Sequence, residues 1–191
     1  MQTPYKFFLL LSICTAVLTA GCSKTSQNTE TPGNAGLETS SENGASSASI
    51  DFEAVTIDGT AVSADLFSEA RLTMVNVWAT YCNPCLSEMP GLGELADAYN
   101  PEDFQLIGII SDVPEGAEEK ALNHASDLVE QTGADYPHLL LNESLYRALL
   151  TEVSAVPTTY FINEGGEILD IVTGAMEKSA WEEKIDALLE K

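Results

Sequence analysis

The sequence predicts an α/β fold in which a layered β-sheet is covered on both sides, and three observations support this. Two continuous apolar runs, residues 72–78 and 104–110, have the composition of strands buried on both faces. Segments with helical spacing of apolar residues alternate with these runs. The chain then ends in a strand pair and a final helix, residues 158–189. The folded part covers residues 50–191, which is long enough to bury a core.

The first elements are expected to be a hairpin, a buried strand and a helix. A turn signal at residues 58–59 lies between short apolar segments and predicts a β-hairpin. The strand at 72–78 leads to a helix that begins near Cys85, and its apolar residues recur at mostly helical spacing as far as Tyr99. Pro90 lies inside this pattern, which predicts a kink.

The second apolar strand is followed by a polar stretch, residues 111–136. The spacing within it predicts a helix over 117–131 that ends at Gly133. A short strand is expected at 138–141 and a short helix at 143–151.

The last elements are expected to be two strands and a helix. Residues 158–162 and 167–172 flank a glycine-rich turn, which predicts a strand pair. Ser179 and Glu182 have the spacing of a capping box at the start of the final helix. One face of that helix is apolar and carries Trp181, Ile185, Leu188 and Leu189.

The start of the chain predicts export. Lys6 precedes an apolar run at residues 7–18, which is shorter than the roughly 20 residues that a membrane-spanning helix needs. Small residues then precede Cys22 in a pattern that resembles a bacterial lipobox, although Thr19 stands where such motifs usually carry leucine. The resemblance implies a lipoprotein signal peptide over residues 1–21 and lipidation of Cys22. The alternative is an ordinary signal peptide followed by an incidental cysteine.

Composition predicts how the domain is attached and which partners are excluded. Residues 22–49 are rich in Ser, Thr, Asn, Gly and Glu, so they are expected to form a flexible tether. With 30 acidic against 8 basic residues, the net charge of -22 repels phosphate backbones and argues against nucleic-acid binding. A lipid anchor places the domain outside the cytoplasm, on the periplasmic side or the outer face of the cell membrane.

The chemistry is concentrated in Cys82-Asn83-Pro84-Cys85, at the junction of a buried strand and a helix. Cys82 would lie at the helix N-terminus, where unpaired N–H groups and the helix dipole favour a thiolate. Cys85 would lie one turn further along, close enough to attack a mixed disulfide. The spacing therefore predicts a nucleophile and a resolving thiol on one rigid element.

Three other interpretations of the cysteine pair remain open from the residues alone. A zinc site needs further ligands, and Cys22, His124 and His138 lack ligand spacing. A structural disulfide can form in an oxidising compartment, but so short a loop gains little stability. A buried inert pair is disfavoured because Asn83 and Pro84 suggest an exposed turn. Both histidines are interpreted as surface or packing residues, and no cofactor is expected.

Residues 78–85, W-A-T-Y-C-N-P-C, resemble the W-x-T-x-C-x-P-C motif of the TlpA/ResA-type membrane-anchored thiol–disulfide oxidoreductases of the thioredoxin superfamily. Pro90 matches the helix-kinking proline of the superfamily, and residues 156–159 resemble its cis-proline loop. The resemblance covers about residues 52–189. It implies a thioredoxin-like fold, with a central mixed β-sheet flanked by helices, an N-terminal β-hairpin and a central helical insertion at 111–136.

The resemblance also implies roles for individual residues. Cys82 would be the nucleophile and Cys85 the resolving thiol. Glu88 matches an acidic residue beside the active site and is a candidate proton shuttle for Cys85, the alternative being a solvated helix glutamate. Pro157, expected to be cis, would bring the Val156 backbone beside the cysteines to pair with a substrate strand. The residues expected to form or shape the substrate-binding surface are Trp78, Tyr81, Pro84, Val156 and Pro157.

For function, the resemblance implies a reductase of disulfides in exported proteins, such as apocytochrome c or a methionine sulfoxide reductase. A reductase is favoured over an oxidant because oxidants of the DsbA kind carry histidine where Pro84 stands. The reductant of this protein would be a membrane electron carrier of the DsbD/CcdA kind. One alternative is a peroxiredoxin-like thiol peroxidase, which needs a threonine three residues before its cysteine, whereas Thr80 is two before Cys82. Another is a non-catalytic metal-delivery lipoprotein on the same fold, which would favour C-x-x-x-C.

Overall fold

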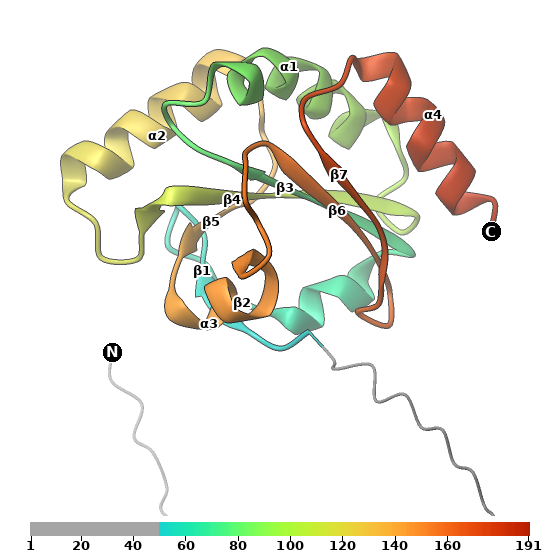
Figure 1. Ribbon diagram of the computed structural model, residues 1–191, viewed down its shortest axis with the longest axis horizontal. Coiled ribbons are helices and arrows are strands. Elements are labelled where there is room, and N and C mark those ends of the chain that lie inside the picture. The colour runs from blue at the N-terminus through green and yellow to red at the C-terminus, as the bar shows by residue number, and fades with distance from the viewer. Residues whose placement is uncertain (1–49) are drawn as a thin grey trace, which may run out of the picture. The chain divides into compact units, whose positions relative to one another are not determined.

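The computed structural model describes residues 50–191 and contains a five-stranded mixed sheet with helices on both faces (Figure 1). The predicted signal peptide (1–21), the lipidation of Cys22 and the tether (22–49) lie outside the described residues. The sheet has the strand order β5-β4-β3-β6-β7. Its strands are β3 (Leu72–Trp78), β4 (Phe104–Pro114), β5 (His138–Leu141), β6 (Thr158–Asn163) and β7 (Ile168–Thr173).

Strand directions confirm that the sheet is mixed. Strand β3 is parallel to β4, and β4 is parallel to β5. Strand β6 is antiparallel to β3, and β7 is antiparallel to β6. Every residue of β3 is buried, because β3 is the central strand and both of its faces are covered.

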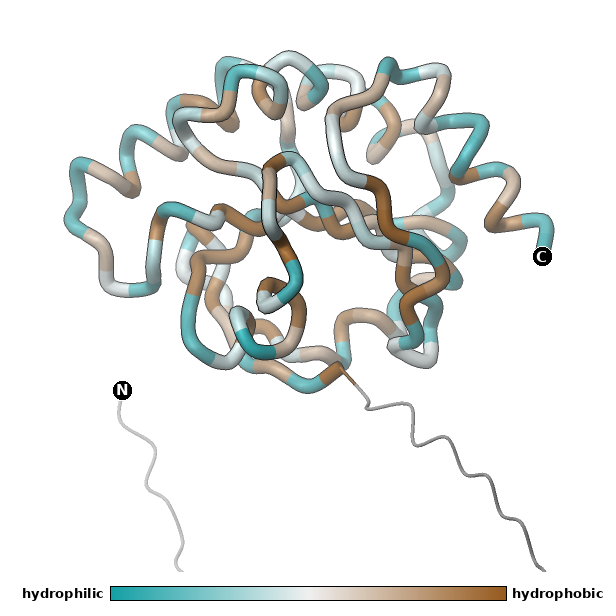
Figure 2. Tube along the Cα trace, viewed as in Figure 1, coloured by the Kyte–Doolittle hydropathy of each residue, from teal (hydrophilic) through white to brown (hydrophobic). Residues whose placement is uncertain are grey.

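The two faces of the sheet are covered by different elements (Figure 1). One face carries the three long helices α1 (Asn83–Ala98), α2 (Glu119–Thr132) and α4 (Lys178–Leu189). The other carries the hairpin of β1 (Glu53–Val55) and β2 (Ala61–Ser63), the 3-10 helix Ala64–Glu69, α3 (Glu143–Leu145) and the π-helical turn Tyr146–Leu150. In Figure 2 the long helices α2 and α4 alternate between hydrophilic and hydrophobic segments, as expected of helices with one buried face.

Most predicted elements are confirmed within a few residues. The antiparallel pairing of β1 with β2 confirms the N-terminal hairpin, and β3 and β5 have the predicted bounds. Helix α2 ends at Gly133, whose φ of 63° is left-handed, as expected of a glycine at this helix end. The segment 111–136 supplies the end of β4 and helix α2, and it thereby makes the crossover that two neighbouring parallel strands require.

The predicted capping box of the last helix is wrong. Helix α4 begins at Lys178 after Glu177, whose side chain makes no capping hydrogen bond, and Ser179 lies inside the helix. The tertiary structure holds the chain just before this point, because the Met176 N–H donates to Glu88. The apolar face is present, since Trp181 and Ile185 are buried. No helix within residues 50–191 combines the length and the apolar character needed to cross a bilayer.

Candidate active site

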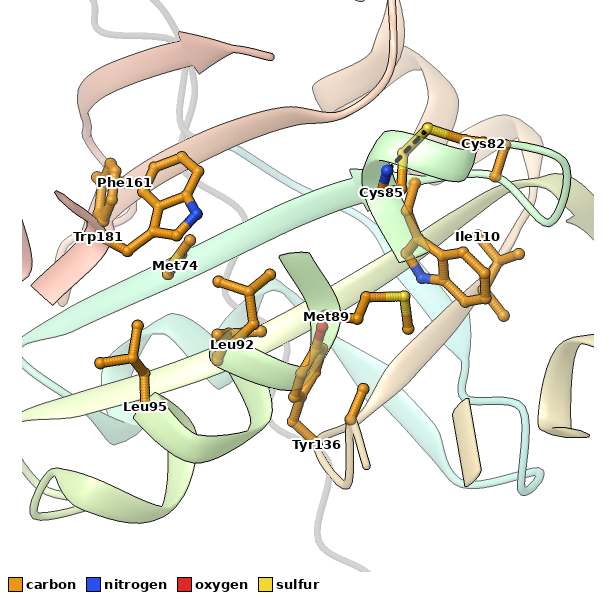
Figure 3. Close-up of a cluster of buried hydrophobic side chains, with 14 of the residues drawn as sticks. Met74, Cys82, Cys85, Met89, Leu92, Leu95, Ile110, Tyr136, Phe161 and Trp181 are labelled. Atoms are coloured by element: carbon orange, nitrogen blue, oxygen red, sulfur yellow. Dashed lines mark hydrogen bonds between the residues drawn. A yellow bond between two sulfur atoms is a disulfide. The ribbon is translucent and has the colours of Figure 1, made fainter. Parts of the chain in front are cut away.

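Cys82 and Cys85 form a disulfide where the chain passes from β3 into α1 (Figure 3). Cys82 occupies the N-cap position of α1, and the Cys85 N–H donates to its sulfur over 3.2 Å. Cys82 is 6% exposed, whereas Cys85 is completely buried. Only Cys82 is therefore placed to meet a molecule outside the protein, and it also receives the N–H groups and dipole of the helix end.

The predicted cis-proline loop lies against this disulfide. The Val156-Pro157 peptide bond is cis, and the Val156 carbonyl oxygen lies 3.7 Å from Cys82 Sγ. Val156 is half-buried and Pro157 is buried. On the other side, Tyr81 is 74% exposed and Pro84 is exposed. Exposed side chains and an accessible backbone thus surround the reactive sulfur.

Two residues at the end of β4, Ser111 and Asp112, hold the loop that leads to the cysteines. The sequence did not predict this contact. The Ser111 hydroxyl donates to the Trp78 carbonyl over 2.8 Å. The Asp112 carboxylate accepts from the Thr80 N–H at 3.0 Å and from the Thr80 hydroxyl at 2.5 Å. A signal was present in the sequence, because Ser111 and Asp112 directly follow the apolar run 104–110. In the structure they lie on β4, which runs parallel to β3, the strand before the cysteines.

Trp78 lies behind the cysteines and has no exposed surface. Its indole N–H donates to His138 Nδ1 over 3.1 Å, so the proton of the imidazole resides on Nε2, which donates to the Ala134 carbonyl over 3.0 Å. Burial lowers the pKa of His138 to about 4 and keeps the ring neutral. His138 is a packing residue that orients Trp78, and His124 is exposed on α2.

Glu88 is buried, so its alternative interpretation as a solvated helix glutamate is wrong. It lies one turn after Cys85 on α1 and is 6% exposed. Its Oε1 accepts from Asn76 Nδ2 at 3.0 Å, and its Oε2 accepts from the Met176 N–H at 3.1 Å and from Trp181 Nε1 at 3.2 Å. Burial raises the pKa of Glu88, and these three donors oppose that rise.

The site lies open at the surface, where Tyr81 and Pro84 are exposed. A hollow of about 740 Å³ is lined by the β1–β2 hairpin and the start of α3, and it includes no residue of the site. Such an open site suits an extended protein segment better than a small molecule, which is usually held in a concave pocket. Within residues 50–191, no three His, Cys, Asp or Glu side chains come together in a way that could hold a metal ion.

Comparison with known proteins adds a family and several relatives. A model of the AhpC/TSA family matches residues 46–171. The chain is 28% identical over 120 residues to the thiol-disulfide oxidoreductase ResA of Halalkalibacterium halodurans, which covers 63% of this chain and 64% of that protein. It is 29% identical over 136 residues to the thioredoxin-like protein YneN of Bacillus subtilis, covering 71% and 75% respectively. The chain thus spans slightly less than two thirds of the ResA protein it matches.

Solved structures show the same fold. A thioredoxin-family thiol:disulfide interchange protein from Chlorobium tepidum superposes with a TM-score of 0.63 at 23% identity, covering 74% of this chain and 94% of that one. The exposed lipoprotein thioredoxin Etrx1 from Streptococcus pneumoniae gives a TM-score of 0.55 at 24% identity, covering 72% and 98%. At these identities the likeness establishes a thioredoxin fold, while function depends on the site itself.

Proposed function

The chain belongs to the AhpC/TSA family, and from that premise we propose that it is a thiol–disulfide oxidoreductase that reduces disulfides in exported proteins. The observation that carries the proposal is the Cys82–Cys85 pair at the start of α1, in which Cys82 keeps 6% of its surface exposed and Cys85 keeps none. Its relatives include two proteins named thiol-disulfide oxidoreductase ResA, which agrees with this chemistry.

The reaction starts from the reduced pair. The Cys82 thiolate attacks one sulfur of a substrate disulfide, so that a mixed disulfide forms and the first substrate thiolate leaves. The helix N-terminus and the Cys85 N–H, which lies 3.2 Å from Cys82 Sγ, favour this thiolate. Cys85 then attacks Cys82 Sγ and releases the second substrate thiolate. Two thiols are oxidised, one substrate disulfide is reduced, and the product is the disulfide seen in this structure.

The surface around Cys82 favours an extended protein substrate. The Val156 carbonyl can accept from a substrate N–H beside the reacting sulfur. Tyr81, just before α1, and Pro84, in its first turn, offer exposed apolar area. Trp78 has no exposed surface, so it supports the loop before α1 from inside the protein and does not contact the substrate.

Glu88 is proposed to accept the proton of Cys85. Because Cys85 is completely buried, bulk water cannot take its proton, and a group inside the protein must do so. Glu88 lies one turn away on the same helix, and burial raises the pKa of its carboxyl toward that of a thiol. When Cys85 transfers its proton, the products are the Cys85 thiolate and a neutral Glu88.

We further propose that the protein is a lipoprotein anchored through Cys22 and re-reduced by a membrane carrier of the DsbD/CcdA kind. The lipobox resemblance at residues 19–22 supports the anchor. Ile50 lines the same hollow as Gly165 and Gly166 of the β6–β7 turn, and Asn163 at the end of β6 pairs with Leu72 at the start of β3. The tether would therefore join the domain at the end of the sheet opposite the cysteines, which would face exported substrates.

A thiol peroxidase is the second candidate, because the family model that matches is that of AhpC/TSA. The geometry does not support it. The residue three before Cys82 is Ala79, and the Thr80 hydroxyl already donates to Asp112. The hydroxyl of Thr80, the threonine nearest to Cys82 in the sequence, is thus already engaged by Asp112.

The test is the reduction potential of the Cys22→Ser protein, equilibrated in glutathione or dithiothreitol buffers. Trp78 and Trp181 are the only tryptophans and both are buried near the site, so their fluorescence can report the change. A potential at or below about -220 mV supports a reductase, whereas one near about -120 mV makes the protein a disulfide donor. Rapid peroxide consumption that survives Cys85→Ser would favour the peroxidase instead.

A further inference from the structure

The Glu88 carboxylate is held from two sides by groups that are distant in sequence. Asn76 reaches it from β3, and Trp181 reaches it from α4. We propose that Asn76 and Trp181 are positioning residues that hold Glu88 ready to accept the proton of Cys85. This inference rests on the proposed oxidoreductase function. It names two further side chains on which the second step of that reaction, the attack of Cys85 on the mixed disulfide, depends.

The hydrogen bonds fix the orientation of the carboxylate. Asn76 on β3 donates to Oε1, while Trp181 on α4 and the Met176 N–H just before α4 donate to Oε2. A glutamate side chain has three rotatable bonds, and burial alone does not select one arrangement of them. With one oxygen bound to the sheet and the other to the C-terminal segment, the carboxylate has a single orientation.

The same hydrogen bonds stabilise the negative charge of Glu88, a role that a neighbouring cation often has in other proteins. The causes that shift the pKa of Glu88 are burial and the three N–H donors, with no contribution from a charged side chain. Cys85 lies one turn before Glu88 on α1, and Tyr136, before β5, has a pKa raised by burial and by the charge of Glu88. At the start of α4, Lys178 is bound to Glu94. The stability of the Glu88 anion therefore depends on neutral donors.

The two side chains differ in what they can offer. The indole of Trp181 can only donate, so it stabilises the ionised carboxylate more than the neutral carboxyl, whose oxygens are weaker acceptors. The amide of Asn76 carries a second buried atom, Oδ1, which has no hydrogen-bond partner among the described residues. A half-turn of the amide would exchange Nδ2 for Oδ1, which could then accept from protonated Glu88 and from the Thr159 hydroxyl, now 3.1 Å from Nδ2. Asn76 can thus serve both protonation states.

The first test uses Trp181→Phe, which removes the N–H and keeps an aromatic ring. The pKa of Glu88 in the reduced protein would be measured by NMR from its carboxyl carbon, with Glu88→Gln identifying the signal. We expect an upward shift of about one pH unit, since a hydrogen bond to a charged group is lost. The pH profile for resolution of a mixed disulfide should move upward with it. Asn76→Leu should shift the pKa less, because it removes a donor from one state and an acceptor from the other.

Tyr99→Phe is the matched control. It removes the 2.8 Å hydrogen bond from Tyr99 to Asp186, which also ties α1 to α4, without touching Glu88. Its Glu88 pKa and pH profile should equal those of the wild type. If Trp181→Phe does not fold, benzothienylalanine at position 181 keeps both rings and lacks the N–H.

The outcomes separate this inference from the proposed function. An unchanged Glu88 pKa in a folded Trp181 variant would show that Trp181 only packs, and the inference would fail. A shifted pKa with an unmoved pH profile would also overturn it, because the carboxylate would then not take the Cys85 proton. A wild-type protein that reduces no protein disulfide at any pH would refute the oxidoreductase function itself.

Discussion

Trp78 and Trp181 are both fully buried, and each donates its indole N–H to one acceptor, but the two acceptors differ in charge. Trp78 binds neutral His138, in a region formed by β3, β4 and β5. Trp181 binds the carboxylate of Glu88, between β3, α1 and α4. The first region holds the loop before the cysteines, and the second holds a group whose protonation is proposed to change in each reaction cycle.

This difference places a neutral hydrogen-bonded pair and a buried carboxylate on either side of the same central strand. In the Trp78 region, burial favours the neutral form of the His138 ring. The hydrogen bond from Trp78 requires the same neutral form, so the two effects act together at neutral pH. In the Trp181 region, burial disfavours the charge that the hydrogen bonds favour, so the two effects are opposed. We expect the first region to respond to steric change and acid, and the second to respond to small changes in hydrogen bonding.

The largest effect is expected from Gly108→Ala, which perturbs the Trp78 region. A Cβ atom at position 108 would stand 2.1 Å from His138 Nδ1, so the imidazole must move and release Trp78. Overpacking of this severity should destabilise the protein by about 3 kcal/mol or more, measured by urea unfolding. Gly165→Ala is the control, because its Cβ would meet only the Asn163 side chain at 3.3 Å. Equal stability of the two variants would refute the tight contact.

The next effect is the response of the Trp78 region to acid. The pKa of His138 is about 4 in the folded protein, below its ordinary value of 6.5. The unfolded chain therefore binds a proton first, and stability should fall between pH 6.5 and pH 4 by at most about 3 kcal/mol. Urea unfolding of the wild type and of His138→Gln across this window gives the contribution by difference. Identical pH slopes would mean that His138 is not held neutral.

Glu88→Gln tests the Trp181 region, where the pKa of the buried group is raised and not lowered as for His138. The pKa of Glu88 is raised in the folded protein, so the stability it contributes is present below its unfolded value of 4.5 and is lost as pH rises through the folded value. We expect the glutamine variant to be more stable than the wild type at pH 7, with the advantage disappearing at acid pH. Thermal unfolding at pH 7 and pH 4 measures this. A variant less stable than the wild type at pH 7 would contradict it.

The smallest effect is expected from Thr159→Val, at the edge of the same region. The change removes one of the two acceptors of Asn76 Nδ2 and leaves the bond to Glu88 in place. A loss of about 1 kcal/mol is expected. Thr158→Val, which loses a hydrogen bond to the Ala155 carbonyl, is a control outside the Glu88 network. If only Thr159→Val moves the NMR signals of the Asn76 side chain, the network is confirmed.

Local patterns predicted much of this protein. The apolar runs predicted β3 and the first part of β4, Gly133 predicted the end of α2, and the C-x-x-C spacing predicted two sulfurs at a helix start. Pro157 was expected to be cis from a resemblance, and the Val156-Pro157 bond is cis. These features depend on residues close together in the chain or on a motif with a known shape, so the sequence alone was sufficient.

The partners of the site could not be found in the same way. Asp112 and Thr80, His138 and Trp78, and Trp181 and Glu88 lie 32, 60 and 93 residues apart, respectively. Periodicity indicates that a residue is buried but not which donor it meets there, because strand order and helix docking decide that. The sequence by itself therefore determined the thioredoxin-like layout and the reactive cysteine pair. Only the tertiary structure decided which groups support those cysteines, since it alone brings distant polar atoms within hydrogen-bond distance.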